Sequence, residues 1–468
     1  MAFVVGSATP EVQAQTVKAV VTLNVPSPGK VRIQAECPPS DSWSFRNAYA
    51  GILGLGKRIE NFQATNSNGE SLSVRTLAPG EFRSTTKATS FSYEVTVLPP
   101  KRLADMSHVS WLKQDYGFLM LADLLPRFTP ELTSQNAILV ELQLPNGWSA
   151  FSSMTPDKHR RHSISDPDGV VFFVGRDLRE KVIRAGSMEL SLVTVGEWAF
   201  EDSEALSVVA RISREYTQVT RYPIAARSVL MLAPFVGGAD QWTAETRGAT
   251  VVLLVGGEAS RAALLGRLKV VLAHELLHLW VPNALAVTGD YDWFFEGFTL
   301  YEALLTSLHL KSITFSEYLD TLGRLYDSYR SSPERDKLSL LEASERRWTT
   351  ASSFVYEKGM LVALLYDLSL RRNSKGNASL SDLYPQLFHS PRPAGPSGSE
   401  FIMGILDSQS GMDEFSKRFI RSPGRLELLD LLAPFGIKVE TAGAHTRLAV
   451  IKELSTEQRK ILRSLGYR

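Results

Sequence analysis

Two histidines and a glutamate stand close together where residues 273–280 read A-H-E-L-L-H-L-W. His274 and His278 are four positions apart, so on an α-helix their side chains lie on one face, one turn apart. Imidazoles placed in this way can bind one zinc ion, while Glu275 lies around the helix, where its carboxylate can contact a metal-bound water. The spacing therefore predicts two metal ligands and a general base. A pair of solvent-facing histidines on an ordinary helix is the alternative.

A third carboxylate follows in an aromatic segment, residues 291–301, which read Y-D-W-F-F-E-G-F-T-L-Y. Glu296 lies 18 positions after His278, at the start of the next helical segment. Its neighbours are large and apolar, so its side chain is expected to be buried, and a buried carboxylate needs a partner. One zinc ion held by His274, His278 and Glu296 would supply that partner. A glutamate favoured by the dipole of a helix N-terminus is the simpler explanation.

Helices must position these residues. Ser260 is a suitable N-cap for a helix that runs to Trp280 and ends before Pro282. The apolar residues of this helix recur at helical spacing, so we expect it to be buried and rigid. They are Leu264, Leu265, Leu268 and Val271. Further helices are expected at residues 296–308, 316–328 and 352–371.

The constellation resembles the gluzincins, a group of zinc peptidases with two histidine ligands and a distal glutamate. The resemblance extends to residues 356–362, Y-E-K-G-M-L-V, which begin 60 positions after Glu296. In gluzincin aminopeptidases a tyrosine in this context donates a hydrogen bond to the developing oxyanion, so the resemblance implies this role for Tyr356. A tyrosine hydroxyl is chemically suited to it. The simpler explanation is a tyrosine that packs at the start of a helix.

Within the gluzincins, the glycyl aminopeptidase family is the closer match. The motifs that carry it are E-G-F-T-L-Y at residues 296–301 and L-V-A-L-L-Y-D-L-S-L-R at residues 361–371. The resemblance covers roughly residues 17–435. It implies a β-rich N-terminal half followed by a thermolysin-like, mainly helical catalytic domain with a small sheet.

Two features depart from this resemblance. Gluzincin aminopeptidases have a glycine-rich strand before the zinc helix, with a glutamate that binds the free α-amine of the substrate. The corresponding residues 247–252, R-G-A-T-V-V, contain no glutamate, and Glu245 comes a few residues earlier. The glycyl aminopeptidase family usually carries a PDZ module, but only 33 residues follow Phe435, too few for one. The choice between exopeptidase and endopeptidase therefore stays open here.

The composition is that of a globular protein with little net charge: 51 Lys and Arg against 50 Asp and Glu among 468 residues. This balance argues against a nucleic-acid partner. The longest apolar run, residues 251–255, is much shorter than the roughly 20 residues of a membrane-spanning helix, so no integral membrane segment is expected. The single cysteine, Cys37, excludes a cysteine-rich metal site and leaves histidine and carboxylate ligands for zinc.

The spacing of apolar residues changes near residue 200, from the period of strands to that of helices, and this change divides the chain into two parts. Short strand-like segments separated by turn signals fill residues 17–200 and predict an all-β sandwich or saddle domain. Helical periods dominate residues 201–435 and predict the catalytic domain, so the whole chain is expected to be a multidomain α+β protein. Residues 1–16 are expected to be a flexible tail or a leader remnant, and residues 436–468 a short C-terminal tail.

The predicted function is that of a zinc-dependent peptidase acting on peptides or proteins. A metal-activated water would attack the peptide bond, with Glu275 as the general base. Two alternatives stay open: a gluzincin-like hydrolase of a non-peptide bond, and a non-catalytic zinc-binding scaffold protein. The N-terminal residues favour a periplasmic or secreted protein over a cytoplasmic one. Nothing in the sequence indicates the oligomeric state.

Three other polar groups receive structural interpretations. Residues 157–162, D-K-H-R-R-H, are expected to form a solvated loop rather than a metal site. Arg346 and Arg347 are expected to be an exposed basic pair, with binding of a substrate carboxylate as the alternative. Glu302 could orient one of the zinc-binding histidines.

Overall fold

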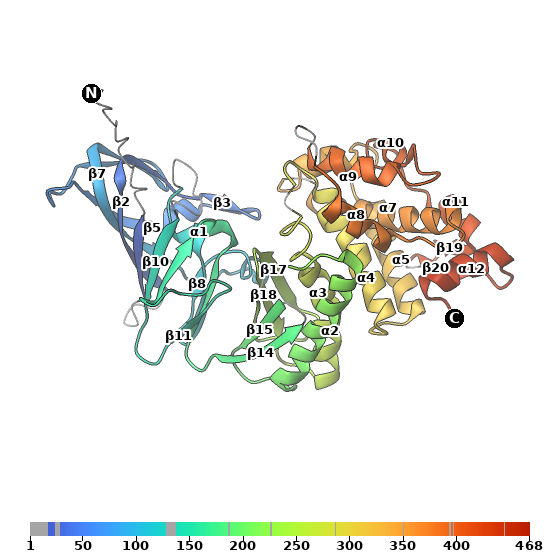
Figure 1. Cartoon of the computed structure of the whole chain (residues 1–468), viewed down its shortest axis with the longest axis horizontal. Coiled ribbons are helices and arrows are strands. Elements are labelled where there is room, and N and C mark those ends of the chain that lie inside the picture. Colours follow the sequence, from blue (N-terminus) through green and yellow to red (C-terminus); the bar gives the residue numbers. More distant parts are fainter. Residues whose placement is uncertain are drawn as a thin grey trace, which may run out of the picture. The chain divides into compact units, whose positions relative to one another are not determined.

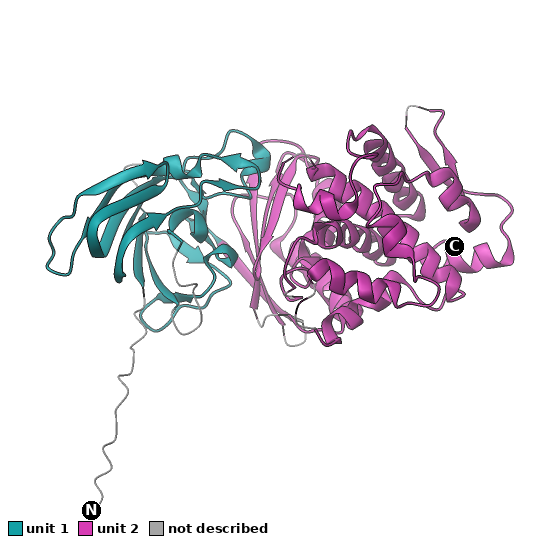
Figure 2. Cartoon of the chain, turned by 90° about the horizontal axis from the view of Figure 1, so that it is seen from above, with its two compact units in different colours: residues 1–178 teal, residues 179–468 magenta. Residues whose placement is uncertain are grey.

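The computed structural model describes most of the chain. The described residues are 17–23, 29–127, 137–185, 188–224, 227–285, 287–349, 351–392, 395, 397–443 and 445–468. The predicted N-terminal tail, residues 1–16, lies outside them. The chain forms two compact units, residues 1–178 and residues 179–468, which Figure 2 colours separately.

Two main sheets and one short two-stranded pair make up most of the first unit, as predicted for a β-rich N-terminal domain. Its larger sheet has the order β12 (Arg161–Ile164), β10 (Ile138–Gln143), β1 (Lys18–Leu23), β2 (Lys30–Ser44), β7 (Glu81–Thr96) and β5 (Ile59–Thr65), and β6 (Val74–Ala78) also pairs with β7. Its smaller sheet has the order β11 (Ser149–Phe151), β13 (Val171–Gly175), β9 (Tyr116–Met120) and β8 (Trp111–Leu112). The short elements between them are β3 (Ala48–Tyr49), β4 (Ile52–Leu53), η1 (Leu55–Arg58), η2 (Leu103–Asp105), α1 (Leu121–Leu124) and η3 (Pro167–Gly169).

Alternation of apolar residues gives these sheets a common interior. In β1 every second side chain is buried, as the period of two along a strand requires. Val21 and Ile33 of the larger sheet belong to the same hydrophobic core as Leu119 and Phe172 of the smaller one. The first unit is therefore a two-sheet arrangement around one core, which confirms the predicted fold class for this part.

The second unit begins with a mixed sheet. Its order is β14 (Arg179–Ala185), β15 (Met188–Thr194), β16 (Arg227–Phe235), β18 (Thr250–Gly256) and β17 (Trp242–Arg247). Strands β15, β16 and β18 are parallel, and β18 is buried along its whole length, as its continuous apolar run predicts. The boundary between the units lies after Leu178 rather than after residue 200, because β15 hydrogen-bonds with β16.

Helices make up most of the remainder, and Figure 1 shows them following the sheet in the chain. Two of them come early: α2 (Asp202–Thr220) and α3 (Arg261–Leu277). A single π-helical turn, η4 (Trp293–Phe298), leads into α4 (Thr299–His309). The later helices are α5 (Phe315–Ser331), α6 (Leu340–Glu345), α7 (Ser352–Asn373), η5 (Leu380–Leu383), α8 (Tyr384–His389), α9 (Gly398–Asp407), α10 (Phe415–Phe419), α11 (Leu428–Leu432) and η6 (Ala433–Phe435). In the described part of the chain, no helix has both the length and the apolar character needed to cross a bilayer.

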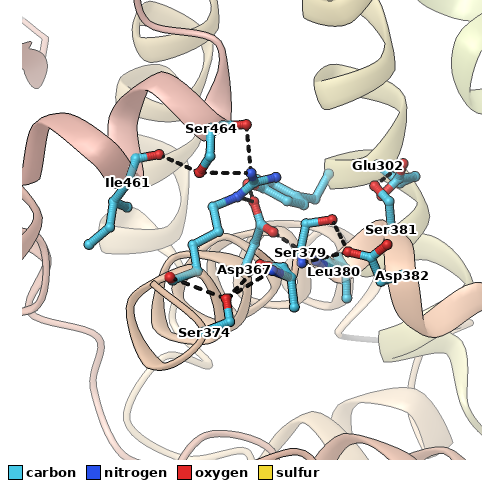
Figure 3. A network of polar contacts seen from close by, with 12 residues as sticks. Glu302, Asp367, Ser374, Ser379, Leu380, Ser381, Asp382, Ile461 and Ser464 are labelled. Carbon is cyan, nitrogen blue, oxygen red and sulfur yellow. Dashed lines mark hydrogen bonds and ion pairs between the residues drawn. The ribbon is translucent and has the colours of Figure 1, made fainter. Parts of the chain in front are cut away.

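Residues 436–468 are part of the second unit rather than a separate tail. They form the hairpin β19 (Ile437–Glu440) and β20 (Arg447–Val450), followed by α12 (Thr456–Leu465). Arg371 of α7 donates to the main-chain oxygen of Ser464 at 2.7 Å and to Asp367 at 2.9 Å. Figure 3 shows Ser464 of α12 and Asp367 of α7 within one network of polar contacts. The hydrogen bonds from the buried Arg371 to Ser464 join α12 to α7.

Glu302 of α4 is buried near the same network. Both oxygens of its carboxylate accept from the Ser381 hydroxyl, at 2.8 and 3.0 Å (Figure 3). Burial raises the pKa of Glu302 from 4.5 to about 8. The pKa of Glu302 is thus higher in the folded protein than its ordinary value. The neutral carboxyl group therefore contributes fully to stability below pH 4.5, and this contribution is lost as the pH rises through 8.

Substitution Glu302→Gln should therefore stabilise the protein more at high pH than at low pH. The amide keeps the shape of the side chain but cannot ionise. We expect a small difference in Tm from the parent protein at pH 5, and at pH 9 a higher Tm for the variant, from a difference in unfolding free energy on the order of a few kcal/mol. Thermal unfolding at both pH values measures this. The exposed Glu345→Gln is the control, and an equal Tm difference at both pH values would disprove the linkage.

Candidate active site

Helix α3 carries the two histidines, and its start is as predicted. The side chain of Ser260 accepts a hydrogen bond from the backbone N–H of Ala263 at 3.3 Å. Leu264 and Leu268 are buried in the core of the second unit, so the helix is fixed along its apolar face. The helix ends at Leu277, with His278 as its C-cap, slightly before the predicted end at Trp280.

The three predicted ligands converge. His274 Nε2 and His278 Nε2 are 3.1 Å apart, and Glu296 Oε2 lies 3.4 and 3.5 Å from them. Neighbouring ligand atoms of a tetrahedral zinc ion are about 3.3 Å apart when the bonds measure about 2.0–2.1 Å. The three atoms therefore already form one face of such a tetrahedron. Among the described residues, this is also the one group of histidines and acidic side chains that meets the geometric requirement for a metal ion.

The Glu296 carboxylate has two different environments. Glu296 Oε2, which faces the histidines, is buried and has no hydrogen-bond partner in the described part of the structure. Glu296 Oε1 accepts from Arg347 at 2.5 Å. Burial alone would raise the pKa of Glu296, but the charges of Arg347 and His278 outweigh it and hold the pKa well below its ordinary value. The acid is thus an anion with one oxygen directed at the imidazoles, as a metal ligand must be.

The orientation of His278 is fixed by the backbone. Its Nδ1 lies 2.9 Å from the carbonyl oxygen of Val281, which can only accept, so Nδ1 carries a proton, and Nε2 is the nitrogen that faces Glu296. The hypothesis that Glu302 orients a histidine is wrong, because its carboxylate binds Ser381 instead. No described residue hydrogen-bonds to Nδ1 of His274.

Glu275 lies beside the last strand of the sheet. Its side chain is buried, and its Oε2 accepts from the Thr246 hydroxyl at 3.0 Å. Thr246 belongs to β17, which ends the described sheet and lies beside α3 (Figure 1). The hydrogen bond leaves the other carboxylate oxygen, Oε1, available as a proton acceptor. Thr246 was not anticipated from the sequence, because only the strand order brings it to Glu275.

Tyr356 is brought to the site by a close contact between helices. It lies near the start of α7, and its hydroxyl is 3.0 Å from Arg347. Gly359 of α7 packs against Gly297 of η4: a Cβ atom added to Gly359 would lie 2.8 Å from both Gly297 Cα and the Trp293 carbonyl oxygen. Only two glycines allow this approach. Because Glu296 precedes Gly297, the contact places the carboxylate and the tyrosine on the same side of the site.

Arg347 is the main residue of the site that the sequence did not reveal. It is only 9% exposed and forms ion pairs with Asp292 at 2.6 Å and with Glu296 at 2.5 Å, whereas Arg346 is exposed. The prediction of an exposed basic pair is therefore wrong for Arg347. Two carboxylates four residues apart in an aromatic segment could have indicated a buried cation, because buried acids require one.

A further glutamate lies on the strand next to Glu275. Glu245 is in β17, adjacent to Thr246, and its carboxylate pairs with the buried Arg247 at 3.0 Å. Of residues 247–252, Arg247 ends β17, residues 248 and 249 form the turn, and the last three begin the next strand, β18. The strand that lies beside the metal-ligand helix thus does contain a glutamate, a few residues earlier in the chain than expected.

Residues 157–162 do not form a metal site. The Asp157 carboxylate accepts from the backbone N–H groups of His159 and Arg161, and from the Arg161 guanidinium. These contacts close an exposed polar turn at residues 157–160, as predicted, whereas Arg161 and His162 are half-buried and begin strand β12 rather than belonging to a loop.

Comparison with known proteins agrees with this geometry. The model of the Peptidase M61 N-terminal domain matches residues 48–169, and that of the M61 glycyl aminopeptidase matches residues 267–362. The second match includes the histidines, Glu296 and Tyr356. No curated protein matches. The resemblance to the glycyl aminopeptidase family is confirmed, and the family matches support a peptidase.

Solved structures share the fold at low sequence identity. A protein of the aminopeptidase N family from Idiomarina loihiensis is 18% identical, with a TM-score of 0.76 over 91% of this chain and 79% of that one. The M1 zinc metallopeptidase from Deinococcus radiodurans is 14% identical, with a TM-score of 0.54 over 89% of this chain and 95% of that one. A mutant of the latter was crystallised with the peptide Tyr-Ser-Ala. These likenesses confirm the succession of a β-rich part and a helical part.

The glycine contact can be tested by adding one methyl group. Gly359→Ala should destabilise the second unit by about 1–3 kcal/mol, because the new Cβ meets backbone atoms that cannot rotate away. Chemical denaturation measures the difference. Gly404→Ala in α9 is the matched control: nothing lies within 4 Å of the added atom, and a helical alanine is favoured over glycine by up to about 1 kcal/mol. Equal stability of the two variants would show that the contact is looser than described.

Proposed function

From the resemblance to the M61 glycyl aminopeptidases in both units, we propose that the protein is a zinc-dependent peptidase that removes residues from the free N-terminus of peptides. The observation that carries the proposal is the triangle of His274 Nε2, His278 Nε2 and Glu296 Oε2, whose sides of 3.1, 3.4 and 3.5 Å suit a tetrahedral zinc ion. When bound there, zinc would supply the Lewis acidity that activates a water and polarises the scissile carbonyl.

Glu275 is the general base in this proposal. Its carboxylate follows His274 directly, so it lies on the side of the helix next to the metal position. It would accept a proton from the attacking water and pass it to the leaving amine. The hydrogen bond from Thr246, at 3.0 Å, fixes one oxygen and leaves the other for this transfer.

Tyr356 is the electrophilic partner. Its hydroxyl would donate to the oxygen that becomes negative when the carbonyl is attacked. Burial raises the pKa of Tyr356 well above its ordinary value, so the hydroxyl keeps its proton and serves as a donor over the physiological pH range. Together with the metal, it would stabilise the tetrahedral oxyanion.

Glu245 is the group that we assign to the substrate's free amine. It lies on β17, the strand beside α3, and its carboxylate is the chemical group that binds an ammonium ion by charge and hydrogen bonds. This assignment favours exopeptidase over endopeptidase activity. A hydrolase of non-peptide bonds and a non-catalytic scaffold would both fail the assays below.

Substitutions in the zinc helix separate metal binding from catalysis. Glu275→Gln should retain zinc and lose activity by about 100-fold or more, because the amide cannot accept the proton. His278→Ala should lose zinc itself, because one of three protein ligands is gone. Metal analysis and a peptidase assay test both, with Glu258→Gln at an exposed site as the control. Full activity in the Glu275 variant would end its assignment as base.

Peptides with free and with acetylated N-termini test the role of Glu245. The parent protein should prefer the free amine, and Glu245→Ala should lower kcat/KM for that substrate by about 10- to 100-fold, as expected for loss of a charged hydrogen bond. The already poor cleavage of the acetylated peptide should hardly change. Equal losses on both substrates would show that Glu245 is structural, and efficient cleavage of acetylated peptides by the parent would indicate an endopeptidase.

A further inference from the structure

The Arg347 guanidinium forms a bridge between three groups of the site. One terminal nitrogen donates to Asp292 Oδ1 at 2.6 Å. The other donates to Glu296 Oε1 at 2.5 Å and to the Tyr356 hydroxyl oxygen at 3.0 Å. One side chain therefore contacts both a predicted metal ligand and the predicted oxyanion donor.

The direction of these hydrogen bonds carries chemical information. A guanidinium has N–H donors and no acceptor, so the Tyr356 oxygen must accept from it. A hydroxyl that accepts in this way keeps its own proton, and the Glu296 carboxylate is near enough to receive it. For the same reason Glu296 Oε1 is occupied, and Oε2 is the oxygen left to face the histidines. The bridge thus sets the donor direction of the tyrosine and the rotation of the carboxylate together.

Arg347 is itself held firmly. Its guanidinium carbon lies 5.1 Å from the ring centre of Phe295 and 4.4 Å from that of Trp348. Such stacking restricts the planar group to one orientation. The two carboxylates of Asp292 and Glu296 would repel each other without the cation between them. Arg347 is therefore fixed by aromatic faces, and it neutralises the acids that it orients.

We propose that Arg347 is a positioning residue of the active site: it fixes the Tyr356 hydroxyl beside Glu296 and holds Glu296 with its other oxygen toward the metal position. The inference rests on the proposed function for the part that concerns Tyr356. It differs from the alternative that Arg347 binds a substrate carboxylate. Its donors already serve three groups of the protein, so a variant should affect turnover rather than substrate affinity.

Zinc affinity is the first readout, because it does not depend on catalysis. We expect Arg347→Met to weaken zinc binding by about 10- to 100-fold in a competition with a chelator, as is usual when the partner of a metal ligand is lost. Arg346→Met is the matched control, since this neighbouring arginine is exposed, and its affinity should equal that of the parent. Unchanged zinc affinity in Arg347→Met would overturn the claim about Glu296.

Steady-state kinetics at saturating zinc is the second readout. Arg347→Met should lower kcat by about 10- to 100-fold while KM stays within about three-fold. The same substitution should cost at least about five-fold less in a Tyr356→Phe background, because the hydroxyl that it orients is absent. Equal losses in both backgrounds would show a merely structural role, and a rise in KM alone would indicate substrate binding; either result overturns the claim about Tyr356.

The lysine variant keeps the test decisive if Arg347→Met does not fold. Arg347→Lys retains the charge between the two carboxylates but lacks the planar fork. The lysine variant should fold, and its loss of zinc affinity should be smaller than the loss expected for the methionine variant. Its kcat should still fall; an unchanged kcat refutes the proposal. A parent protein that binds zinc but cleaves no peptide would refute the proposed function alone, and the zinc affinities would still decide the role of Arg347 toward Glu296.

Discussion

The site depends on one buried carboxylate, Glu296, whose two oxygens have different partners. Oε1 accepts from Arg347, and Oε2 faces His274 and His278 with no hydrogen bond of its own in the described structure. A buried anion is costly unless it is compensated, and a single cation on one side leaves the other oxygen unsatisfied. A cation placed between Oε2 and the imidazoles would give this oxygen the partner that it lacks among the described residues. This requirement connects the fold to the proposed chemistry.

Contacts between neighbouring elements hold the side chains of the site in fixed positions. The approach of Gly297 to Gly359 brings η4 and α7 together, and with them Glu296 and Tyr356. The carbonyl of Val281 fixes His278, and Thr246 at the end of the sheet fixes Glu275. These supports come from different elements of the second unit: the close contact of η4 with α7, the turn after α3 and strand β17. Such support is what keeps reactive groups within a fraction of an ångström of a productive geometry.

Much of the site could be predicted because its information is local. Histidines four residues apart on a helix, an N-cap at Ser260 and a carboxylate enclosed by aromatic residues all lie within short stretches of sequence, and the structure brings the three ligand candidates together as expected. The continuous apolar run of β18 likewise identified a covered strand. The local sequence is informative when a structural feature depends on the spacing of residues within a single helix or strand.

The features that were missed are non-local. Arg347 follows another arginine, and nothing nearby shows that it returns to Glu296, 51 positions earlier. The sequences of β14 and β15 are strand-like in the same way as those of the first unit. Only the pairing of β14 with β15, and of β15 with β16, shows that these strands belong to the second unit. Residues 436–468 were interpreted as a short tail with a terminal helix; that this helix packs on the second unit was missed because Arg371, which holds it, lies 93 positions away from Ser464. Pairing partners at such distances cannot be inferred from one sequence.

The most direct test of the central claim is a crystal structure of the zinc-loaded protein with anomalous diffraction measured at the zinc absorption edge. The account predicts one strong anomalous peak within about 2.0–2.2 Å of His274 Nε2, His278 Nε2 and Glu296 Oε2, with Arg347 still bound to the other oxygen of Glu296. A peak elsewhere, or no peak at this position at saturating zinc, would contradict it.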